Sequence, residues 1–273
     1  MLIVQLSDTH IKPEGRLAYK RVDTAFFLTR AVEHVRRLTP RPDIVVVTGD
    51  LVDAGLEEEY VRLRRLLASL PMPVYVIPGN HDAREPLRRV FGRDGYLPAE
   101  GAYLHYVLEQ YPLRLIALDT LVPGQGGGAL GPERLAWLDA RLAEAPRRPT
   151  LVFMHHPPFK TGLEGMDVQW LEDGDALGAV VQRHAQVEGV TCGHVHRAIH
   201  ARWCGTVVTT APSSAHQIAL DLRQPGALGW VMEPPACLLH LWREGSGVVT
   251  HTSPIGDFAG PYPFYGPDGR LID

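Results

Sequence analysis

The sequence predicts an α/β fold with a layered core and a partly parallel sheet. Over the first 190 residues, short and uniformly apolar runs alternate with segments in which apolar residues recur at helical spacing. This alternation is typical of a sheet whose faces are covered by helices. The chain has 273 residues, of which 45% are hydrophobic and 21% are charged. It is therefore long enough to bury a large core without disulfides.

Strands are predicted where apolar residues follow one another without alternation, because strands buried on both faces have this pattern. In the first 190 residues such runs occupy positions 2–6, 44–47, 74–77, 113–118, 151–154 and 187–191. Helices are predicted where apolar residues recur every three or four positions. The three helical segments are 22–38, 57–70 and 132–145. Pro40 and Pro42 end the first helix, and Pro132 suits the first turn of the third.

After Gly193 the pattern changes to short strand-like runs separated by turns. These runs occupy positions 199–203, 206–210, 216–220, 237–242 and 248–252. We expect them to complete one domain that spans residues 1–273. The last stretch, 259–273, is rich in Gly, Pro and Tyr and predicts an irregular tail.

Composition excludes several classes of protein. The chain carries 27 Lys and Arg against 31 Asp and Glu, a formal net charge of −4, which argues against a protein that coats nucleic acid. The opening decapeptide lacks a basic segment and a long apolar stretch, so we expect no signal peptide, no membrane span and a cytoplasmic location. Three cysteines are too few for a disulfide framework. Thirteen histidines hint at metal chemistry based on histidine and carboxylate ligands.

Polar residues gather where five of the predicted strands end. The clusters are Asp8-Thr9-His10, Gly49-Asp50-Leu51-Val52-Asp53, Gly79-Asn80-His81-Asp82, His155-His156 and Gly193-His194-Val195-His196. In an α/β sheet, ligands bind at the carboxyl ends of the strands, so we expect the five clusters to converge. Gly49 and Gly79 are predicted to let the backbone turn sharply beside them.

Together these clusters predict a centre that binds two metal ions. In Asp8-x-His10 and His194-x-His196, an extended backbone would place both side chains on one side of the chain. A mixture of carboxylate, amide and imidazole ligands suits Zn, Mn or Fe better than Ca or Mg. Two ions about 3.5–4 Å apart share a ligand, and Asp50, in the middle of the set, is the predicted bridge.

These motifs, in this order, resemble those of the calcineurin-like metallophosphoesterase superfamily. The family pattern is D-x-H, G-D-x-x-D, G-N-H-D/E, a further His and G-H-x-H, and the resemblance covers at least residues 1–211. The runs VVVTGDLVD (45–53), IPGNHD (77–82) and MHHPP (154–158) are most similar to the bacterial branch of class III cyclic-nucleotide phosphodiesterases and glycerophosphodiesterases.

The resemblance implies a four-layer α/β/β/α sandwich of two mixed β-sheets with a small cap. Members of this branch often form dimers or higher homo-oligomers through the cap. The candidate cap and oligomerisation segments in this sequence are 224–235 and, second, 95–111.

The resemblance also assigns the site residues. One metal would be held by Asp8, His10, Asp50 and His196. The second would be held by Asp50, Asn80, His156 and His194. His81 would not bind metal but would face the phosphate, to stabilise charge or protonate the leaving oxygen. Asp53 would orient His81, and His216 would face the substrate.

The function implied is hydrolysis of a small phosphodiester, such as 3′,5′-cyclic AMP or a glycerophosphodiester. A hydroxide that bridges two Fe, Mn or Zn ions would attack the phosphorus in line with the leaving alkoxide. We expect a small-molecule substrate, no long nucleic acid, no membrane partner and a homo-oligomer. A phosphomonoesterase or broad-specificity phosphatase could share all five motifs, and no single residue separates these alternatives.

Other functions fit less well. Residues 124–129 match the dinucleotide-binding pattern G-x-G-x-x-A, but Gly131-Pro132 precede the next helix and no acidic residue ends a second strand about 20 residues on. Intact His81 and Asp53 argue against a scaffold that binds metal without catalysis. A structural zinc site could use Cys192, His194, His196 and Cys204 as ligands. These residues lack the C-x₂₋₄-C spacing that is typical of such sites.

Overall fold

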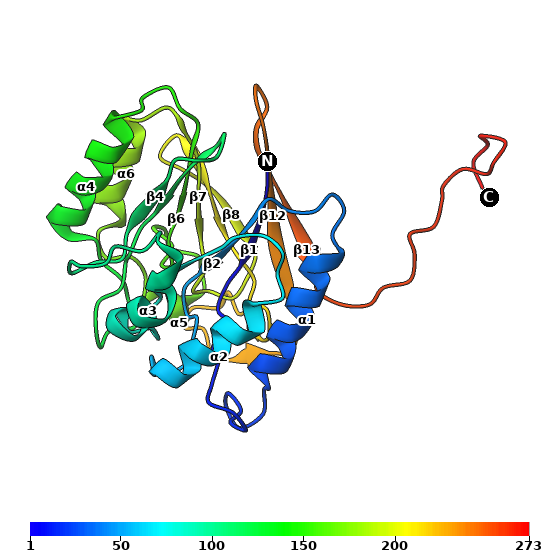
Figure 1. Cartoon of the computed structure of the whole chain (residues 1–273), viewed down its shortest axis with the longest axis horizontal. Coiled ribbons are helices and arrows are strands. Elements are labelled where there is room, and N and C mark those ends of the chain that lie inside the picture. The colour runs from blue at the N-terminus through cyan, green and yellow to red at the C-terminus, as the bar shows by residue number, and fades with distance from the viewer. Residues whose placement is uncertain (273) are drawn as a thin grey trace.

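Two mixed β-sheets pack face to face between outer layers of helices in the computed structural model, which describes residues 1–272 (Figure 1). The five-stranded sheet has the order β13-β12-β1-β2-β3. Its strands are β1 (Leu2–Leu6), β2 (Ile44–Thr48), β3 (Val74–Ile77), β12 (Ala236–Arg243) and β13 (Gly247–Pro254). Strands β1, β2 and β3 are parallel, whereas β12 and β13 run antiparallel to their neighbours.

The six-stranded sheet has the order β4-β5-β6-β7-β9-β8. Its strands are β4 (Tyr106–Leu108), β5 (Arg114–Ala117), β6 (Thr150–Phe153), β7 (Val187–Cys192), β8 (Ile199–Trp203) and β9 (Thr206–Thr210). Strands β5, β6, β7 and β9 are parallel, and β4 and β8 are antiparallel edge strands. A separate hairpin pairs β10 (Gln217–Ile218) with β11 (Trp230–Val231).

The outer layers cover one sheet each. Helices α1 (Thr24–Arg37) and α2 (Glu57–Leu67) lie on the five-stranded sheet, and α4 (Gly131–Ala143) and α6 (Gly174–Gln182) lie on the six-stranded sheet (Figure 1). The remaining helical turns are α3 (Arg84–Phe91), η1 (Gly92–Asp94) and α5 (Glu164–Asp167). The predicted four-layer α/β/β/α sandwich is therefore confirmed.

Helices α3 and α6 and the short turns η1 and α5 were not predicted, because their sequences carry weak helical signals. Helix α3 buries only Leu87, Val90 and Phe91, too few residues for a clear repeat. Helix α6 begins at a glycine and contains Gly178. A Cβ atom at Gly178 would lie 2.5 Å from Cys204 Sγ, so close packing on the β8–β9 turn explains this glycine.

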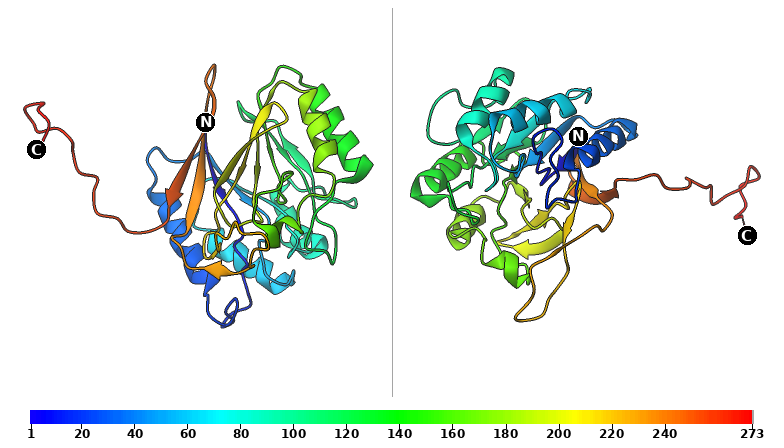
Figure 2. Two further views of the ribbon diagram at one scale, coloured as in Figure 1. Left: turned by 180° about the vertical axis from the view of Figure 1, so that it is seen from behind. Right: turned by 90° about the horizontal axis from the view of Figure 1, so that it is seen from below.

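The two candidate cap segments lie in different parts of the structure. In 95–111, the side chains of Leu97, Leu104 and Tyr106 are buried in the main core, and the segment contains edge strand β4. This part belongs to the sandwich, whereas residues 99–102 are exposed. In contrast, 224–235 contains β11 and the exposed loop between β10 and β11, which projects from the body in the right view of Figure 2. The predicted irregular tail runs away from the body through residue 272 (Figures 1 and 2), and Asp273 lies outside the described residues.

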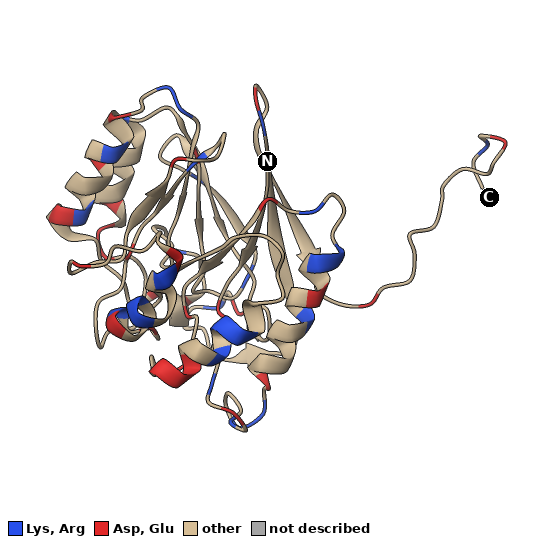
Figure 3. Ribbon diagram, in the orientation of Figure 1, with Lys and Arg blue, Asp and Glu red and all other residues tan. Residues whose placement is uncertain are grey.

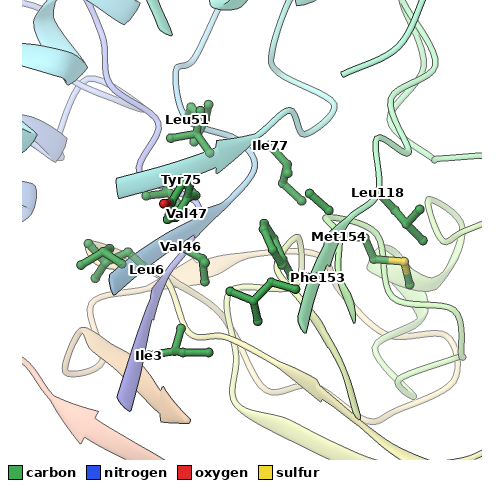
Figure 4. Close-up of a cluster of buried hydrophobic side chains, with 14 of the residues drawn as sticks. Ile3, Leu6, Val46, Val47, Leu51, Tyr75, Ile77, Leu118, Phe153 and Met154 are labelled. Atoms are coloured by element: carbon green, nitrogen blue, oxygen red, sulfur yellow. The ribbon is translucent and has the colours of Figure 1, made fainter. Parts of the chain in front are cut away.

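The core between the sheets is apolar except for one buried polar link. Figure 4 shows Ile3 and Val46 of the five-stranded sheet facing Phe153 of the other sheet. Beside them, the Gln5 amide donates to Thr48 Oγ1 (2.8 Å) and to the Cys192 carbonyl (2.9 Å). Its own oxygen lies 2.9 Å from His240 Nε2. Gln5 thus joins three elements and fixes one sheet against the other.

Replacing Gln5 should therefore weaken the fold. In Gln5→Leu, buried partners lose their hydrogen bonds, and each unsatisfied group costs about 1–3 kcal/mol. We expect the free energy of unfolding, measured by urea titration, to fall by about 2 kcal/mol or more. Gln182→Leu on the exposed face of α6 is the control and should change it by less than about 0.5 kcal/mol. Equal midpoints for both variants would contradict this role for Gln5.

For the described residues, no helix combines the length and the apolar character that a membrane span requires.

Candidate metal centre

The polar clusters at the strand ends meet at one place, between the carboxyl ends of the two sheets. Several groups of histidine and carboxylate ligand atoms lie there within 4.8 Å of one another. The side chains come from the loops after β1, β2, β3, β6 and β7. The predicted convergence of these five clusters is therefore confirmed.

The first group consists of Asp8, His10 and His196, with Asp50 beside it. His196 Nε2 lies 3.4 Å from Asp8 Oδ1 and 3.2 Å from His10 Nε2. The other ring nitrogen of His196 lies 3.0 Å from the carbonyl oxygen of His216. Because Nδ1 must carry the proton to donate to this carbonyl, Nε2 presents its lone pair to the group.

The second group consists of Asp50, Asn80, His155 and His194. His155 Nε2 lies 3.3 Å from Asp50 Oδ1 and 3.1 Å from Asn80 Oδ1. His194 Nδ1 lies 3.0 Å from the same Asn80 oxygen. His155 Nδ1 donates to the carbonyl of Thr48 (2.8 Å). Like His196, His155 is thus oriented by a backbone carbonyl that leaves Nε2 facing the site.

The structure brings His155, and not the predicted His156, next to Asp50. The ring nitrogens of His156 come within 4.8 Å of those of His155 and His194, but both already have partners. Nδ1 lies 2.8 Å from Thr120 Oγ1, and Nε2 lies 3.2 Å from the Gly126 carbonyl. A neutral imidazole donates through one nitrogen and accepts through the other, so these two contacts use both. By its contacts, the structure thus places His155, rather than the predicted His156, beside Asp50 and Asn80.

Asp50 lies between the two groups. Its Oδ1 faces His155 at 3.3 Å, and its Oδ2 faces His10 Nε2 at 3.6 Å. The backbone N–H of His81 also donates to Asp50 Oδ1 (2.9 Å), which fixes the plane of the carboxylate. One carboxylate with an oxygen toward each group is the geometry that a bridging ligand requires.

Backbone strain is concentrated at these same residues. Of the eight non-glycine residues with positive φ in residues 1–272, five belong to the two groups. Their φ values are 52° at Asp8, 41° at His10, 45° at Asp50, 72° at His194 and 47° at His196. The expectation that D-x-H and H-x-H are extended is therefore wrong. Each such residue costs on the order of 1–3 kcal/mol, and strain of this kind clusters at functional sites.

Glycines make room for the ligands. A Cβ atom at Gly79 would lie 2.3 Å from both the backbone nitrogen and Oδ1 of Asp50. A Cβ atom at Gly49, where φ is +81°, would lie 2.4 Å from His155 Nδ1. The predicted sharp turn is thus found at Gly49, whereas Gly79 is required for close approach.

The charges of the site call for a cation. Asp8 and Asp50 are buried, and among residues 1–272 no Lys or Arg forms an ion pair with either. Burial raises the pKa of Asp8 to about 7. Burial lowers the pKa of His194 to about 3 and that of His196 to about 4, so these two rings are neutral. Although burial opposes it, the Asp50 carboxylate raises the pKa of His155 to about 9. Buried carboxylates beside imidazoles form a donor set that fits transition metal ions, and a cation bound there would replace the proton of His155.

His81 borders the site without joining either group. It lines a cavity of about 250 Å³ together with His10, Asp50 and Asn80. Its Nδ1 lies 2.9 Å from the backbone carbonyl of Asp53. Although burial opposes it, the Asp50 carboxylate raises the pKa of His81.

Asp53 was expected to orient His81, and it does so through its backbone. The Asp53 carboxylate forms an ion pair with Lys12 and lies 3.8 Å from His10 Nδ1. Its side chain therefore pairs with Lys12, whereas its carbonyl holds His81.

His216, which was predicted to face the substrate, lies next to the first group. It is fully buried, with no hydrogen-bond partner at either ring nitrogen. Its ring centroid lies 4.7 Å from that of His196 and 5.7 Å from that of His10. It is not among the side chains that line the cavity, and its role toward the substrate stays a prediction.

Sequence reasoning missed two residues that position side chains of the site. Thr120 holds His156, as described above, and no motif marks it. The Asp82 carboxylate accepts hydrogen bonds from the backbone N–H groups of Gly79 (2.7 Å) and Leu51 (3.1 Å) and from Tyr60 Oη (2.8 Å). Asp82 is the last residue of the G-N-H-D motif, so its presence in the motif was the available signal.

Comparison with known proteins agrees with this geometry. A family model described as calcineurin-like phosphoesterase matches residues 1–198. The chain is also similar in fold to the dimetal phosphatase from Danio rerio, with a TM-score of 0.62 and 15% identity over 94% of this chain and 99% of that one.

Several relatives match over most of their length. The chain is 46% identical to the "probable glycerophosphodiester phosphodiesterase GpdQ" of Arcobacter nitrofigilis, over 100% of both chains. It is 33% identical to the glycerophosphodiester phosphodiesterase GpdQ of Enterobacter lignolyticus, over 96% of this chain and 94% of the relative. It is 33% identical to the 3′,5′-cyclic adenosine monophosphate phosphodiesterase CpdA of Pseudomonas aeruginosa, over 83% of each. The chain therefore belongs to the calcineurin-like phosphoesterase family.

Proposed function

We propose that the protein is a metal-dependent phosphodiesterase that hydrolyses small phosphodiesters, either glycerophosphodiesters or cyclic nucleotides. The observation that carries this proposal is the pair of buried ligand groups that share Asp50 and are bordered by His81. The names of the relatives, glycerophosphodiester and cyclic AMP phosphodiesterases, support the same activity.

The proposed cofactor is a pair of transition metal ions, Fe, Mn or Zn. The ligands of the first ion would be Asp8, His10, Asp50 and His196. The ligands of the second would be Asp50, Asn80, His155 and His194. Bound there, the two ions would lower the pKa of water toward about 7 and screen the phosphoryl oxygens.

The protein's own groups orient the ester and place a proton. Asn80 is a neutral oxygen donor, so it adds no negative charge that would repel a phosphate. His81 donates from Nδ1 to the Asp53 carbonyl, which leaves Nε2 free for the cavity. In the reaction, water adds to phosphorus, one P–O ester bond breaks, and the leaving oxygen takes a proton. We propose that His81 Nε2 stabilises the phosphoryl oxygens or supplies that proton.

The lining of the cavity favours a diester over a monoester. A monoester carries one more negative charge than a diester at neutral pH, yet no Lys or Arg is among the residues that line the cavity in the described chain. On the outer surface, Lys and Arg alternate with Asp and Glu along the helices (Figure 3). The lack of a basic stripe supports a small substrate over a long nucleic acid.

The cytoplasmic location and the assembly into a homo-oligomer stay predictions.

The substrate class is tested with one panel in Mn²⁺. We expect bis(p-nitrophenyl) phosphate and at least one of cyclic AMP and glycerophosphoethanolamine to be hydrolysed with a higher kcat/KM than p-nitrophenyl phosphate. The physical reason is the single negative charge of a diester, which matches the lining. Faster turnover of the monoester than of every diester would contradict the proposal.

The ligand assignment at the second ion is tested by a matched pair of variants. His155→Ala should lose about one metal equivalent, because it removes the ring beside Asp50 and Asn80. His156→Ala should keep both equivalents, since the ring of His156 is held by Thr120 and Gly126. Metal content is measured by mass spectrometry after gel filtration. The reverse outcome, metal lost from His156→Ala alone, would restore the original assignment.

The role of His81 is tested separately from metal binding. We expect His81→Ala to lower kcat by about 10²- to 10⁴-fold, the usual value of a positioned acid or base, while the metal content stays that of the unmodified protein. His251→Ala, an exposed histidine on β13, is the control and should change neither. Loss of metal in step with activity in His81→Ala would show that His81 acts as a ligand.

A further inference from the structure

The side of the cavity that faces the metal centre is apolar and partly aromatic. It is built by Tyr19, from the loop before α1, and by Ile218, Leu228 and Trp230, from the β10–β11 hairpin. Met166 of α5 completes it. We propose that this wall is a subsite for an uncharged flat ring on one ester substituent of the substrate, and that Tyr19 and Trp230 select such substrates. This inference rests on the proposed function.

The rings of Tyr19 and Trp230 form an aromatic surface at the cavity. Tyr19 and Trp230 stack with centroids 5.4 Å apart and an interplanar angle of 22°. Both line the cavity, and Tyr19 is 51% exposed. Tyr19 also has a φ of 49°, a strained backbone for a bulky residue. Exposed aromatic side chains of this kind are the surfaces on which flat rings stack.

The wall is held in a fixed position relative to the metal ligands. Arg197, the residue after the ligand His196, donates to the Ile218 carbonyl (2.6 Å) and pairs with Glu233 (2.8 Å). His196 itself donates to the carbonyl of His216 (3.0 Å), at the start of the hairpin. The hairpin is thus tied at both ends to the segment that carries His196.

The contacts beneath the aromatic pair are also packed. The Tyr19 ring lies against the buried ring of His216 at 5.0 Å, and Trp230 packs on the small cluster of Ala18, Val22 and Ala215. The two segments therefore support each other, and the stacked pair is a rigid wall that a substrate would meet ready-formed.

The charges around the wall decide between kinds of substituent. In the described part of the chain, no Lys or Arg lines the cavity, and its only carboxylate is Asp50. Of the acidic residues that contact the hairpin, Asp221 pairs with Arg223, Glu233 pairs with Arg197, and Glu164 accepts a hydrogen bond from the Gly226 N–H. Neither an anionic nor a cationic substituent would find a free counter-charge on the wall. Among the described side chains that line the cavity outside the two ligand groups and His81, Gln169 and Tyr19 carry the polar groups that could bind a polyol.

An uncharged flat ring, such as a nucleobase or an aryl group, would gain the most binding free energy from this surface. Such a ring stacks on aromatic side chains regardless of its hydrogen-bond donors and acceptors. Loss of one stacking side chain costs roughly 10- to 100-fold in binding. A quaternary ammonium group, as in choline, also binds aromatic faces, but it would do so here without an acidic partner. We therefore assign the wall to the neutral ring, and choline esters become the competing outcome of the test.

The test compares kcat/KM for two ring diesters, bis(p-nitrophenyl) phosphate and cyclic AMP, with glycerophosphoethanolamine and glycerophosphocholine. In Trp230→Leu and Tyr19→Leu, which keep bulk but remove the ring, kcat/KM should fall about tenfold or more for the ring diesters, mainly through KM. It should change by less than about threefold for glycerophosphoethanolamine. Trp230→Phe should restore most of the loss. Leu222→Ala, an exposed hairpin residue outside the cavity lining, is the matched control and should resemble the unmodified protein.

An equal loss for all four substrates, or a loss confined to glycerophosphocholine, would overturn the neutral-ring subsite. Binding measurements separate this result from failure of the proposed function. By calorimetry, the Mn²⁺-loaded protein should bind adenosine 5′-monophosphate about tenfold more tightly than glycerol 3-phosphate, and Trp230→Leu should remove the difference. If no diester is hydrolysed but this difference is found, the subsite stands and the proposed reaction is wrong. If diesters are hydrolysed and the difference is missing, the subsite is wrong.

Discussion

The central constraint on this structure is a buried carboxylate that must serve two ligand groups at once. Asp50 directs one oxygen toward His155 and the other toward His10, and in residues 1–272 no Lys or Arg pairs with it. A buried carboxylate needs a compensating positive charge, and its neighbours are histidines whose ring nitrogens can also bind a cation, so the surrounding chain must hold Asp50 in place for that cation. The left-handed backbone at Asp50, the missing Cβ at Gly79 and the hydrogen bond from the His81 N–H all serve this purpose.

The rest of the fold can be understood as the support for that position. Parallel strands β1, β2 and β3 end at one edge, and β6 and β7 of the second sheet end opposite them, so ligands from both sheets reach Asp50. The relative position of the sheets therefore matters to the site. The buried Gln5 link fixes that position, and Asp82 joins the loops after β2 and β3. Each of these contacts lies outside the ligand groups but determines where the ligands lie.

The sequence was sufficient for most strands and for the convergence of the ligands, because buried parallel strands leave continuous apolar runs and polar residues follow them directly. It was insufficient where two neighbouring residues offer the same chemistry. His155 and His156 are both histidines after β6, and only the contacts with Thr48 and Thr120 decide which ring faces the metal centre. The extended geometry expected for D-x-H was wrong for a related reason. Two residues that are separated by one position in the sequence can adopt several backbone conformations. Here the tertiary contacts selected the strained, left-handed conformation.

The central claim is that Asp50 serves both metal sites, and metal titration tests it most directly. Mn²⁺ binding is measured by calorimetry and by metal analysis for Asp50→Ala, His10→Ala and Asn80→Ala. The account predicts that His10→Ala weakens one site, that Asn80→Ala weakens the other, and that Asp50→Ala weakens both. If Asp50→Ala lost one ion and bound the other with the affinity of the unmodified protein, the shared carboxylate, and the two-site arrangement built on it, would be contradicted.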